Sequence, residues 1–323
     1  MKSDILEGLS ERVQEIRATR TDLYASENVE PVLTCPVCGA SSGESDLHLT
    51  IYRAQYHQCR GCGHAYVNPR PTSAAVDAYY ASSVDYSATY TDVEKAMQRV
   101  RGIAEPRVRW MTAVYEETYG RKPRTILDVG AGGGHFVRAC LDAGYEAKGL
   151  EVSEPSRVFA RNHFEIELLS EDFTNPAFDA GRPDIITFWG VIEHVTDPAS
   201  LVEATARHLS EEGIVIAGVP KFNSVDTMIQ TLCNDTVVRH LDPLGHINCF
   251  SENSLLTLFD RFAFDPASVW YFGMDAYEVL VQCGLRSEDP GFFERIKAAI
   301  PLLQQAIDRA ALSDEVTLAL RPR

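Results

Sequence analysis

Four glycines lie within five positions of the stretch ILDVGAGGGHF, residues 126–136. Glycines spaced this closely let a backbone approach a ligand without hindrance from side chains. A dinucleotide-binding loop has the pattern G-x-G-x-x-G, which from Gly130 requires a glycine where this chain has His135. The residues instead follow the pattern D-x-G-x-G-x-G, with members Asp128, Gly130, Gly132 and Gly134. The loop therefore favours a ligand other than a dinucleotide.

Four cysteines form the pattern C-x2-C-x20-C-x2-C, with members Cys35, Cys38, Cys59 and Cys62. This spacing lets two turns present four thiolates to one tetrahedral zinc ion. Four cysteines leave no open position for water or substrate, so the zinc is expected to be structural. A redox-active C-x-x-C pair is the alternative. His57 and His64 are near enough in sequence to replace a cysteine as ligands, but with four cysteines present they are expected to lie on the surface. The remaining cysteines are expected to be small buried apolar residues: Cys140, Cys233, Cys249 and Cys283.

Alternating strands and helices are expected to position these residues. Strands are expected at 125–129, 146–151, 165–169, 184–189 and 213–219. Such alternation indicates a mostly parallel sheet covered by helices. After a helix at 251–261, residues 265–272 and 276–283 are expected to form an antiparallel hairpin. Asp184 is expected to be structural, as a cap at the start of its strand.

The glycine loop resembles the S-adenosylmethionine loop of class I methyltransferases. The fourth strand ends in FWGVIEHVTDP at 188–198, which is similar to the V-L-E-H-V-x-D-P signature of the same superfamily. The resemblance covers roughly residues 120–283 and implies an α/β, Rossmann-like fold. The expected architecture is a seven-stranded class I methyltransferase sheet with a terminal antiparallel hairpin, plus a small N-terminal zinc ribbon.

The resemblance also implies which residues bind the cofactor S-adenosylmethionine. Glu151 would accept hydrogen bonds from the two ribose hydroxyls. Asp172 and Phe173 would contact the adenine, and Trp189 would border the methyl group. The full predicted set is Asp128, Gly130, Ala131, Gly132, Gly134, Glu151, Val152, Asp172, Phe173, Trp189 and Gly190.

The methyl acceptor is expected beyond the C-terminal ends of the strands. The tyrosine-rich stretch 79–90 and the insertion 221–250 are expected to cover that edge. A neutral oxygen or nitrogen acceptor must release a proton, for which His246 is the first catalytic candidate and His194 the second. A structural role is the alternative for each histidine, and Glu193 beside His194 leaves a divalent-metal pair open.

The predicted organisation has five parts. They are an N-terminal helix at 1–30, the zinc ribbon at 31–72, a tyrosine-rich linker and helical cap at 73–120, the methyltransferase domain at 121–283 with 221–250 as its lid insertion, and a helical tail at 284–323. The apolar stripe of the first helix would pack on the body of the protein or on a second copy in a homodimer.

Composition limits the classes of partner. The net charge is −16, with 46 acidic and 30 basic residues and no basic cluster, which argues against nucleic acid. No signal-peptide pattern begins the chain, and no apolar run of about 18 residues occurs. A cytoplasmic location without a membrane partner is therefore expected.

The segment after the cysteines, CGHAYVNPRPTSAAVDAYYASSVDY, resembles the linker between zinc ribbon and methyltransferase domain in one bacterial group. That group serves surface-polysaccharide and secondary-metabolite pathways, which implies a small-molecule or carrier-linked acceptor. The predicted activity is methylation of oxygen or nitrogen, with carbon left open. The alternatives are an RNA methyltransferase that holds RNA with its ribbon and a non-catalytic module that binds S-adenosylmethionine.

Overall fold

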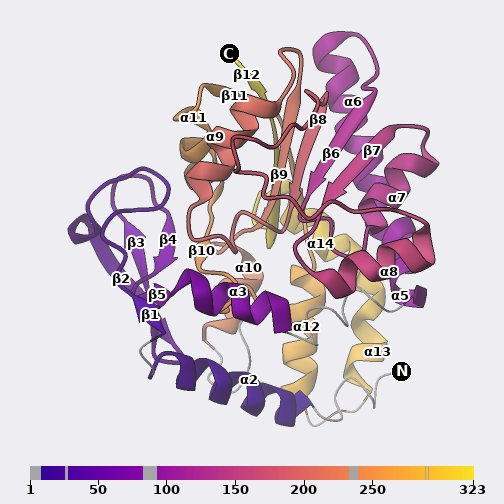
Figure 1. The fold of residues 1–323 in the computed structure, drawn as a ribbon. Coiled ribbons are helices and arrows are strands. Elements are labelled where there is room, and N and C mark those ends of the chain that lie inside the picture. Colours follow the sequence, from indigo (N-terminus) through magenta and orange to yellow (C-terminus); the bar gives the residue numbers. More distant parts are fainter. Residues whose placement is uncertain (1–8, 26–27, 83–92, 233–238, 288, 290) are drawn as a thin grey trace. The chain divides into compact units, whose positions relative to one another are not determined.

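The computed structural model describes residues 9–25, 28–82, 93–232, 239–287, 289 and 291–323 (Figure 1). The chain divides into two compact units. The ribbon unit comprises Met1–Thr72, Pro220–Leu255 and Trp270–Val316. The sheet unit comprises Ser73–Val219, Leu256–Val269 and Thr317–Arg323. Of the predicted tyrosine-rich stretch 79–90, residues 83–90 lie outside the described residues.

The sheet unit is built on a six-stranded sheet within the described residues, with the strand order β11-β12-β9-β8-β6-β7. The pairs β6–β7, β6–β8 and β8–β9 are parallel. Strands β8 and β9 are apolar except for Thr187 because helices cover both faces of a parallel sheet. The strands are β6 (Thr125–Val129), β7 (Glu146–Leu150), β8 (Ile185–Trp189), β9 (Ile214–Pro220), β11 (Phe264–Phe272) and β12 (Glu315–Pro322).

Helices cover this sheet, and α9 lies on the opposite side of the strands from α7 (Figure 1). The apolar side chains of α6 and α7, among them Met111 and Phe136, pack with Ile126 and Ile185 of the sheet in one buried cluster. The helices are α5 (Val93–Arg99), the π-helical turn η2 (Val100–Ala104), α6 (Glu105–Tyr119), α7 (His135–Asp142), α8 (Glu154–Phe164), α9 (Pro198–His208) and α11 (Glu252–Asp260). As predicted, the Ser251 hydroxyl accepts a hydrogen bond from the Ser254 N–H at the start of α11.

Two predicted strands are wrong. Residues 276–283 lie in helix α12 (Asp275–Arg286), where Ala276 and Leu280 are buried one helical turn apart. The sequence AYEVLVQC satisfies both a helical and an extended apolar pattern, so its period alone does not decide between them. Residues 165–169 contribute only a bridge between Leu150 and Leu169. The predicted helical tail is helical in α13 (Phe292–Ile296), η3 (Lys297–Ala299) and α14 (Ile300–Arg309), but it ends in strand β12.

The ribbon unit contains a four-stranded antiparallel sheet of order β10-β4-β3-β2 within the described residues. Its small core joins Tyr56 of β3 and Val67 of β4 to Phe222 and Cys249 of the insertion. The ribbon unit also contains α12, α13, η3 and α14, and its other elements are α2 (Leu9–Leu23), β1 (Val29–Glu30), η1 (Ser42–Glu44), β2 (Ser45–Ile51), β3 (Ala54–Cys59), β4 (Ala65–Val67), β5 (Arg70–Pro71), α10 (Val225–Gln230) and β10 (Asn248–Cys249). Helix α3 (Ser73–Ser82) begins the sheet unit. The described part of the insertion therefore completes the sheet of the ribbon.

Asp184 is the structural cap that the sequence predicts. Its carboxylate accepts hydrogen bonds from the backbone N–H of Arg124 (2.7 Å), the hydroxyl of Tyr115 (2.9 Å) and the guanidinium of Arg121 (3.1 Å). Burial alone would raise the pKa of Asp184, but these donors together hold that pKa below its ordinary value. The ionised carboxylate thus fastens α6 to the start of β6 and β8.

We expect Asp184→Asn to lower the free energy of unfolding by about 2 kcal/mol at pH 7, because charged acceptors make the stronger hydrogen bonds. The pKa of Asp184 is depressed in the folded state, so its stabilisation is present above the ordinary carboxyl pKa of about 3.9 and is lost as the pH falls through the folded value. Urea unfolding at pH 7 and pH 3 measures both effects. Glu211→Gln, an exposed change in the turn before β9, is the control. Equal stability of the two variants at pH 7 would contradict the assignment.

Candidate cofactor and metal sites

The glycine loop connects β6 to α7 and needs glycine for two physical reasons. Gly130, Gly132 and Gly134 have φ values of 78°, 53° and 80°, in the left-handed region that side chains disfavour. A Cβ atom on Gly130 would lie 2.5 Å from Val191 Cγ2. The N–H groups of Gly130 and Ala131 both donate to the carbonyl of Leu150, at 2.9 and 2.8 Å. The loop is therefore held against the end of β7.

Glu151 follows β7 and fixes the same loop from its side chain. Its carboxylate is 3% exposed and accepts from the N–H groups of Gly132 and Ser153, each at 2.7 Å. Burial raises the pKa of Glu151, whereas these two hydrogen bonds lower it. Each carboxylate oxygen can accept a further hydrogen bond, so the group is chemically able to receive two hydroxyls of a ligand.

Asp128 is buried at the end of β6, with 3% of its surface exposed. Its carboxylate accepts from the Thr187 hydroxyl at 2.7 Å, which ties β6 to β8. Burial raises the pKa of Asp128 to about 7, although the Thr187 hydrogen bond and the charge of Arg107 lower it. Asp128 is predicted to bind the cofactor, but its hydrogen bond with Thr187 joins two strands of the sheet.

The residues predicted to contact adenine follow the bridge at Leu169. The Asp172 carboxylate accepts from the N–H and hydroxyl of Thr174, both at 2.8 Å, and the side chain is exposed. Phe173 is buried, with its ring edge-on to Phe188 at 5.7 Å. Val152, by contrast, is 76% exposed. An exposed carboxylate beside an apolar surface is compatible with binding a purine.

Trp189 ends β8 and has a neighbour that sequence analysis missed. The Arg107 guanidinium of α6 lies 4.3 Å from the centre of the indole ring, a cation–π contact. Among the described residues, Trp189 Nε1 is buried without a hydrogen-bond partner. Gly190 has φ of 68°, and its N–H donates to the Gly218 carbonyl at 2.9 Å. Arg107 belongs to no recognisable sequence motif. It reaches Trp189 only because α6 packs on the sheet, so the sequence alone could not reveal this contact.

The two candidate catalytic histidines belong to different units. His194 lies in the turn after β8, with Nε2 3.7 Å from Oε1 of the buried Glu193. His246 lies in the ribbon unit, where Nδ1 donates to the carbonyl of His240 at 3.2 Å. In a neutral imidazole this donor assignment makes Nε2 of His246 the basic nitrogen.

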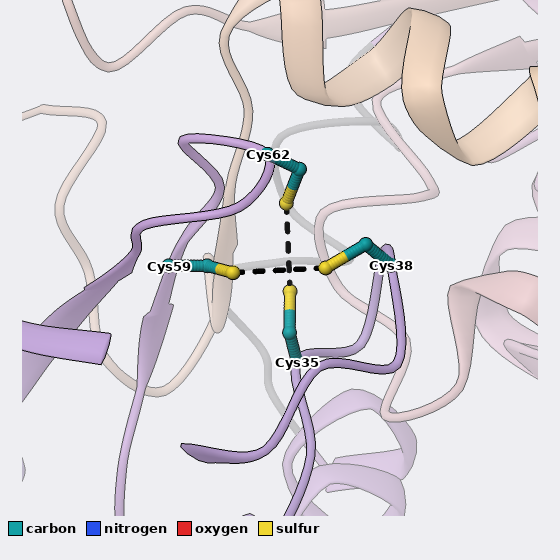
Figure 2. A group of neighbouring side chains, drawn as sticks. All are labelled: Cys35, Cys38, Cys59 and Cys62. Carbon is teal, nitrogen blue, oxygen red and sulfur yellow. Dashed lines mark hydrogen bonds between the residues drawn. The ribbon is translucent and has the colours of Figure 1, made fainter. Parts of the chain in front are cut away.

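The four predicted zinc ligands converge in the ribbon unit. The sulfur atoms of Cys35 and Cys62, and those of Cys38 and Cys59, are 3.6 Å apart, and all four point toward a common centre (Figure 2). This separation is close to the ~3.8 Å expected between sulfurs on a tetrahedral zinc with bonds of ~2.3 Å. It is much longer than the ~2.05 Å of a disulfide. The donor set and its geometry therefore fit zinc.

Expectations for other residues around the ribbon are partly wrong. His64 is fully buried rather than on the surface, 3.2 Å from Asn248 Oδ1, because β10 packs across it. Burial lowers the pKa of His64 to about 4. Cys140 and Cys249 are buried as predicted, Cys283 is exposed, and Cys233 lies outside the described residues.

None of the described helices is long and apolar enough to cross a membrane.

Comparison with known proteins gives the same architecture. The sequence model of a family described as "Methyltransferase domain" matches residues 103–269, more than half of the chain. The ubiquinone biosynthesis O-methyltransferase of Bordetella avium is 29% identical over 161 residues, 48% of this chain and 66% of that protein. The corresponding protein of Thiobacillus denitrificans is 31% identical over 143 residues, 42% of this chain and 59% of that protein. The chain thus spans less than two thirds of the length of these relatives.

A solved structure agrees on the fold. The plantazolicin methyltransferase BpumL, in complex with a pentazolic desmethylPZN analog and SAH, has a TM-score of 0.50 and 18% identity, covering 77% of this chain and 95% of that one. The predicted Rossmann-like methyltransferase fold is confirmed, with six described strands in place of the seven expected. With a family match across residues 103–269 and this sheet beneath it, the chain belongs to the methyltransferase-domain family.

Proposed function

We propose that this protein is an S-adenosylmethionine-dependent methyltransferase that acts on an oxygen or nitrogen of a small biosynthetic intermediate. The observation that carries the proposal is the edge formed by the C-terminal ends of β6, β7 and β8. Because these strands are parallel, the glycine loop, Glu151 and Trp189 all follow strands at that one edge. Ligands of open parallel sheets bind at such an edge.

The proposed cofactor contacts use groups whose geometry is already fixed. The glycine loop admits the amino-acid end and ribose of the cofactor, and Glu151 accepts from the ribose hydroxyls. Phe173 offers an apolar face and Asp172 an acceptor for the adenine amino group. Trp189 and Arg107 border the region where the methyl group would lie. When bound, the cofactor supplies a methyl group on a positively charged sulfur.

The transfer itself depends on positioning and on removal of a proton. In an in-line displacement the bond from sulfur to methyl breaks as the bond from the acceptor atom to methyl forms, so alignment of the reactants supplies most of the acceleration. A hydroxyl or amine acceptor loses its proton to a base, for which we retain His246 first and His194 second. Residues 221–250 as a lid and 73–120 as a cap are part of the same proposal.

Oxygen is the acceptor favoured by the relatives, whose names describe O-methyltransferases of ubiquinone biosynthesis. The acceptor of this chain is proposed only as a small or carrier-linked molecule. The excess of acidic residues, 46 against 30 basic ones, supports a substrate other than nucleic acid.

We further propose that the four thiolates hold one structural zinc ion. The residues fit: the four sulfurs lie within 4.8 Å of one another, and the knuckle glycines Gly39 and Gly63 have φ values of 76° and 74°. Their N–H groups donate to the carbonyls of Cys35 and Cys59, each at 2.9 Å. The site would hold the two turns of the ribbon together.

We expect Glu151→Ala to weaken binding of S-adenosylmethionine and its demethylated product at least about tenfold, since hydrogen bonds to a charged group contribute ~1.5–3 kcal/mol each. The change also removes the acceptor that holds the Gly132 N–H. Isothermal titration calorimetry measures the affinities. Glu167→Ala, which removes an exposed carboxylate paired with Arg161, is the control and should bind as the wild type does. Unchanged affinity of Glu151→Ala, or tighter binding of a nicotinamide dinucleotide, would refute the assignment.

For the thiolate site we expect about one zinc per chain by elemental analysis. Cys35→Ser should lose the metal and unfold at a lower temperature, because the ribbon depends on the ion for its fold. Cys283→Ser alters an exposed cysteine outside the quartet and should keep both the metal and the stability. Wild-type protein that carries no metal, together with a Cys35→Ser variant as stable as wild type, would exclude a zinc site.

For the base we expect His246→Ala to reduce turnover by ~10²–10⁴ while the affinity for the cofactor stays nearly constant. Wild-type activity should rise with pH through a single group as the imidazole loses its proton. His194→Ala, assayed in parallel with a verified hydroxyl or amine substrate, identifies which histidine matters more. A loss of less than threefold in His246→Ala would make that residue structural.

A further inference from the structure

A second cluster of metal-binding residue types lies in the ribbon unit, apart from the cysteines. It consists of Asp226 in α10, His240 in the segment that follows it, and Asp314 directly before β12. One ligand atom from each residue lies within 4.8 Å of the other two. The three residues are 0%, 4% and 0% exposed. The fold thus buries two carboxylates and an imidazole together.

Two of these side chains have buried polar atoms without a hydrogen-bond partner among the described residues. Among the described residues, neither carboxylate oxygen of Asp226 has a hydrogen bond, and neither does Nδ1 of His240. Buried polar groups in folded proteins are almost always satisfied, and a buried carboxylate without a donor is the most costly exception. The site therefore needs a positive charge.

The remaining groups do not supply enough of that charge. The neighbouring Asp275 accepts from the N–H groups of Asp226 (3.1 Å) and Asp314 (2.8 Å), and Glu278 lies close enough to act on the cluster through its charge. Arg239 donates to Asp314 Oδ2 at 2.7 Å, and Lys221 acts on Asp275. These cations face Asp314 and Asp275, and neither donates to Asp226. With all four carboxyl groups ionised, the two cations leave an excess of two negative charges, which a divalent cation would balance.

We propose that Asp226, His240 and Asp314 bind one divalent transition-metal cation. Ligands on a cation with bonds of ~2.1 Å are separated by roughly 3.0–4.2 Å, and His240 Nε2 already lies 3.0 Å from Asp314 Oδ2. An imidazole with two carboxylates suits Mn²⁺, Fe²⁺ or Zn²⁺ better than Mg²⁺ or Ca²⁺. The cation gives Asp226 a partner and cancels the excess charge.

Such an ion would be structural and would join segments that are distant in sequence. Asp314 leads into β12, and its Oδ1 accepts from the Met274 N–H before α12 at 3.0 Å. Asp226 belongs to α10, and His240 precedes His246, whose Nδ1 donates to the His240 carbonyl. The metal would therefore fix the backbone from which His246 projects.

The proposal is tested by counting the Mn²⁺ ions bound to full-length protein with electron paramagnetic resonance, after one equivalent of zinc per chain has been added to fill only the four-cysteine site. Wild-type protein should bind one equivalent of Mn²⁺. Asp226→Asn should weaken binding at least about 100-fold, because loss of a mere outer partner of a ligand already costs ~10–100-fold. Glu252→Gln, a half-buried carboxylate of the same unit that bonds Tyr271, is the matched control and should bind as the wild type does.

Thermal unfolding provides the second measurement. At a free Mn²⁺ concentration about 100 times the dissociation constant, the midpoint should rise by roughly 5 °C in wild type and not in Asp226→Asn or His240→Gln. Wild-type protein that binds no Mn²⁺, Co²⁺ or Zn²⁺ beyond the thiolate site would overturn the proposal without any variant. Undiminished binding in both variants would overturn it as well. In that case Asp226 is a protonated buried acid, and Asp226→Asn should be at least as stable as wild type.

Discussion

The contact on which the cofactor edge depends is the one between the glycine loop and the end of β7. The Gly130 and Ala131 N–H groups share the Leu150 carbonyl, and the next side chain, Glu151, takes the Gly132 N–H. Parallel pairing of β6 with β7 sets the register in which these groups meet. A loop with three residues in the left-handed region is held in one conformation before any ligand arrives, which reduces the entropy lost on binding.

Three buried aspartates show how the number of donors determines the state of a carboxyl group. Asp184 has several donors, including Arg121, and its pKa is depressed. Among the described residues only the Thr187 hydroxyl donates to the Asp128 side chain, and burial raises the pKa of Asp128 to about 7. Asp226 has no donor to its side chain among the described residues, and its pKa rises to about 8. The same residue type is thus an ionised cap at Asp184, a group that titrates near neutrality at Asp128, and a buried acid without a donor at Asp226.

Patterns within a few neighbouring residues were enough to predict part of the fold and of the candidate site. The glycine loop, β6, β8, β9 and the paired cysteines all carry short-range signals of turn, burial or ligand spacing. Features that depend on distant pairing were not predictable in this way. Strand β12 comes from a tail whose own pattern is helical, and β10 is only two residues long. His64 is buried because β10 packs across it, and Arg107 meets Trp189 only through the packing of α6 on the sheet.

The pairing of β10 with β4 has a consequence for synthesis of the chain. Asn248 and Cys249 lie opposite Tyr66 and Ala65, and the Val67 N–H donates to the Ile247 carbonyl at 3.0 Å. A nascent chain therefore exposes the open edge of β4 until roughly 180 further residues have been translated. At ~5–20 residues per second this delay is roughly 10–40 s. During that interval the unpaired edge of β4 can pair with a strand of another nascent chain. A chaperone that covers this edge would prevent such association.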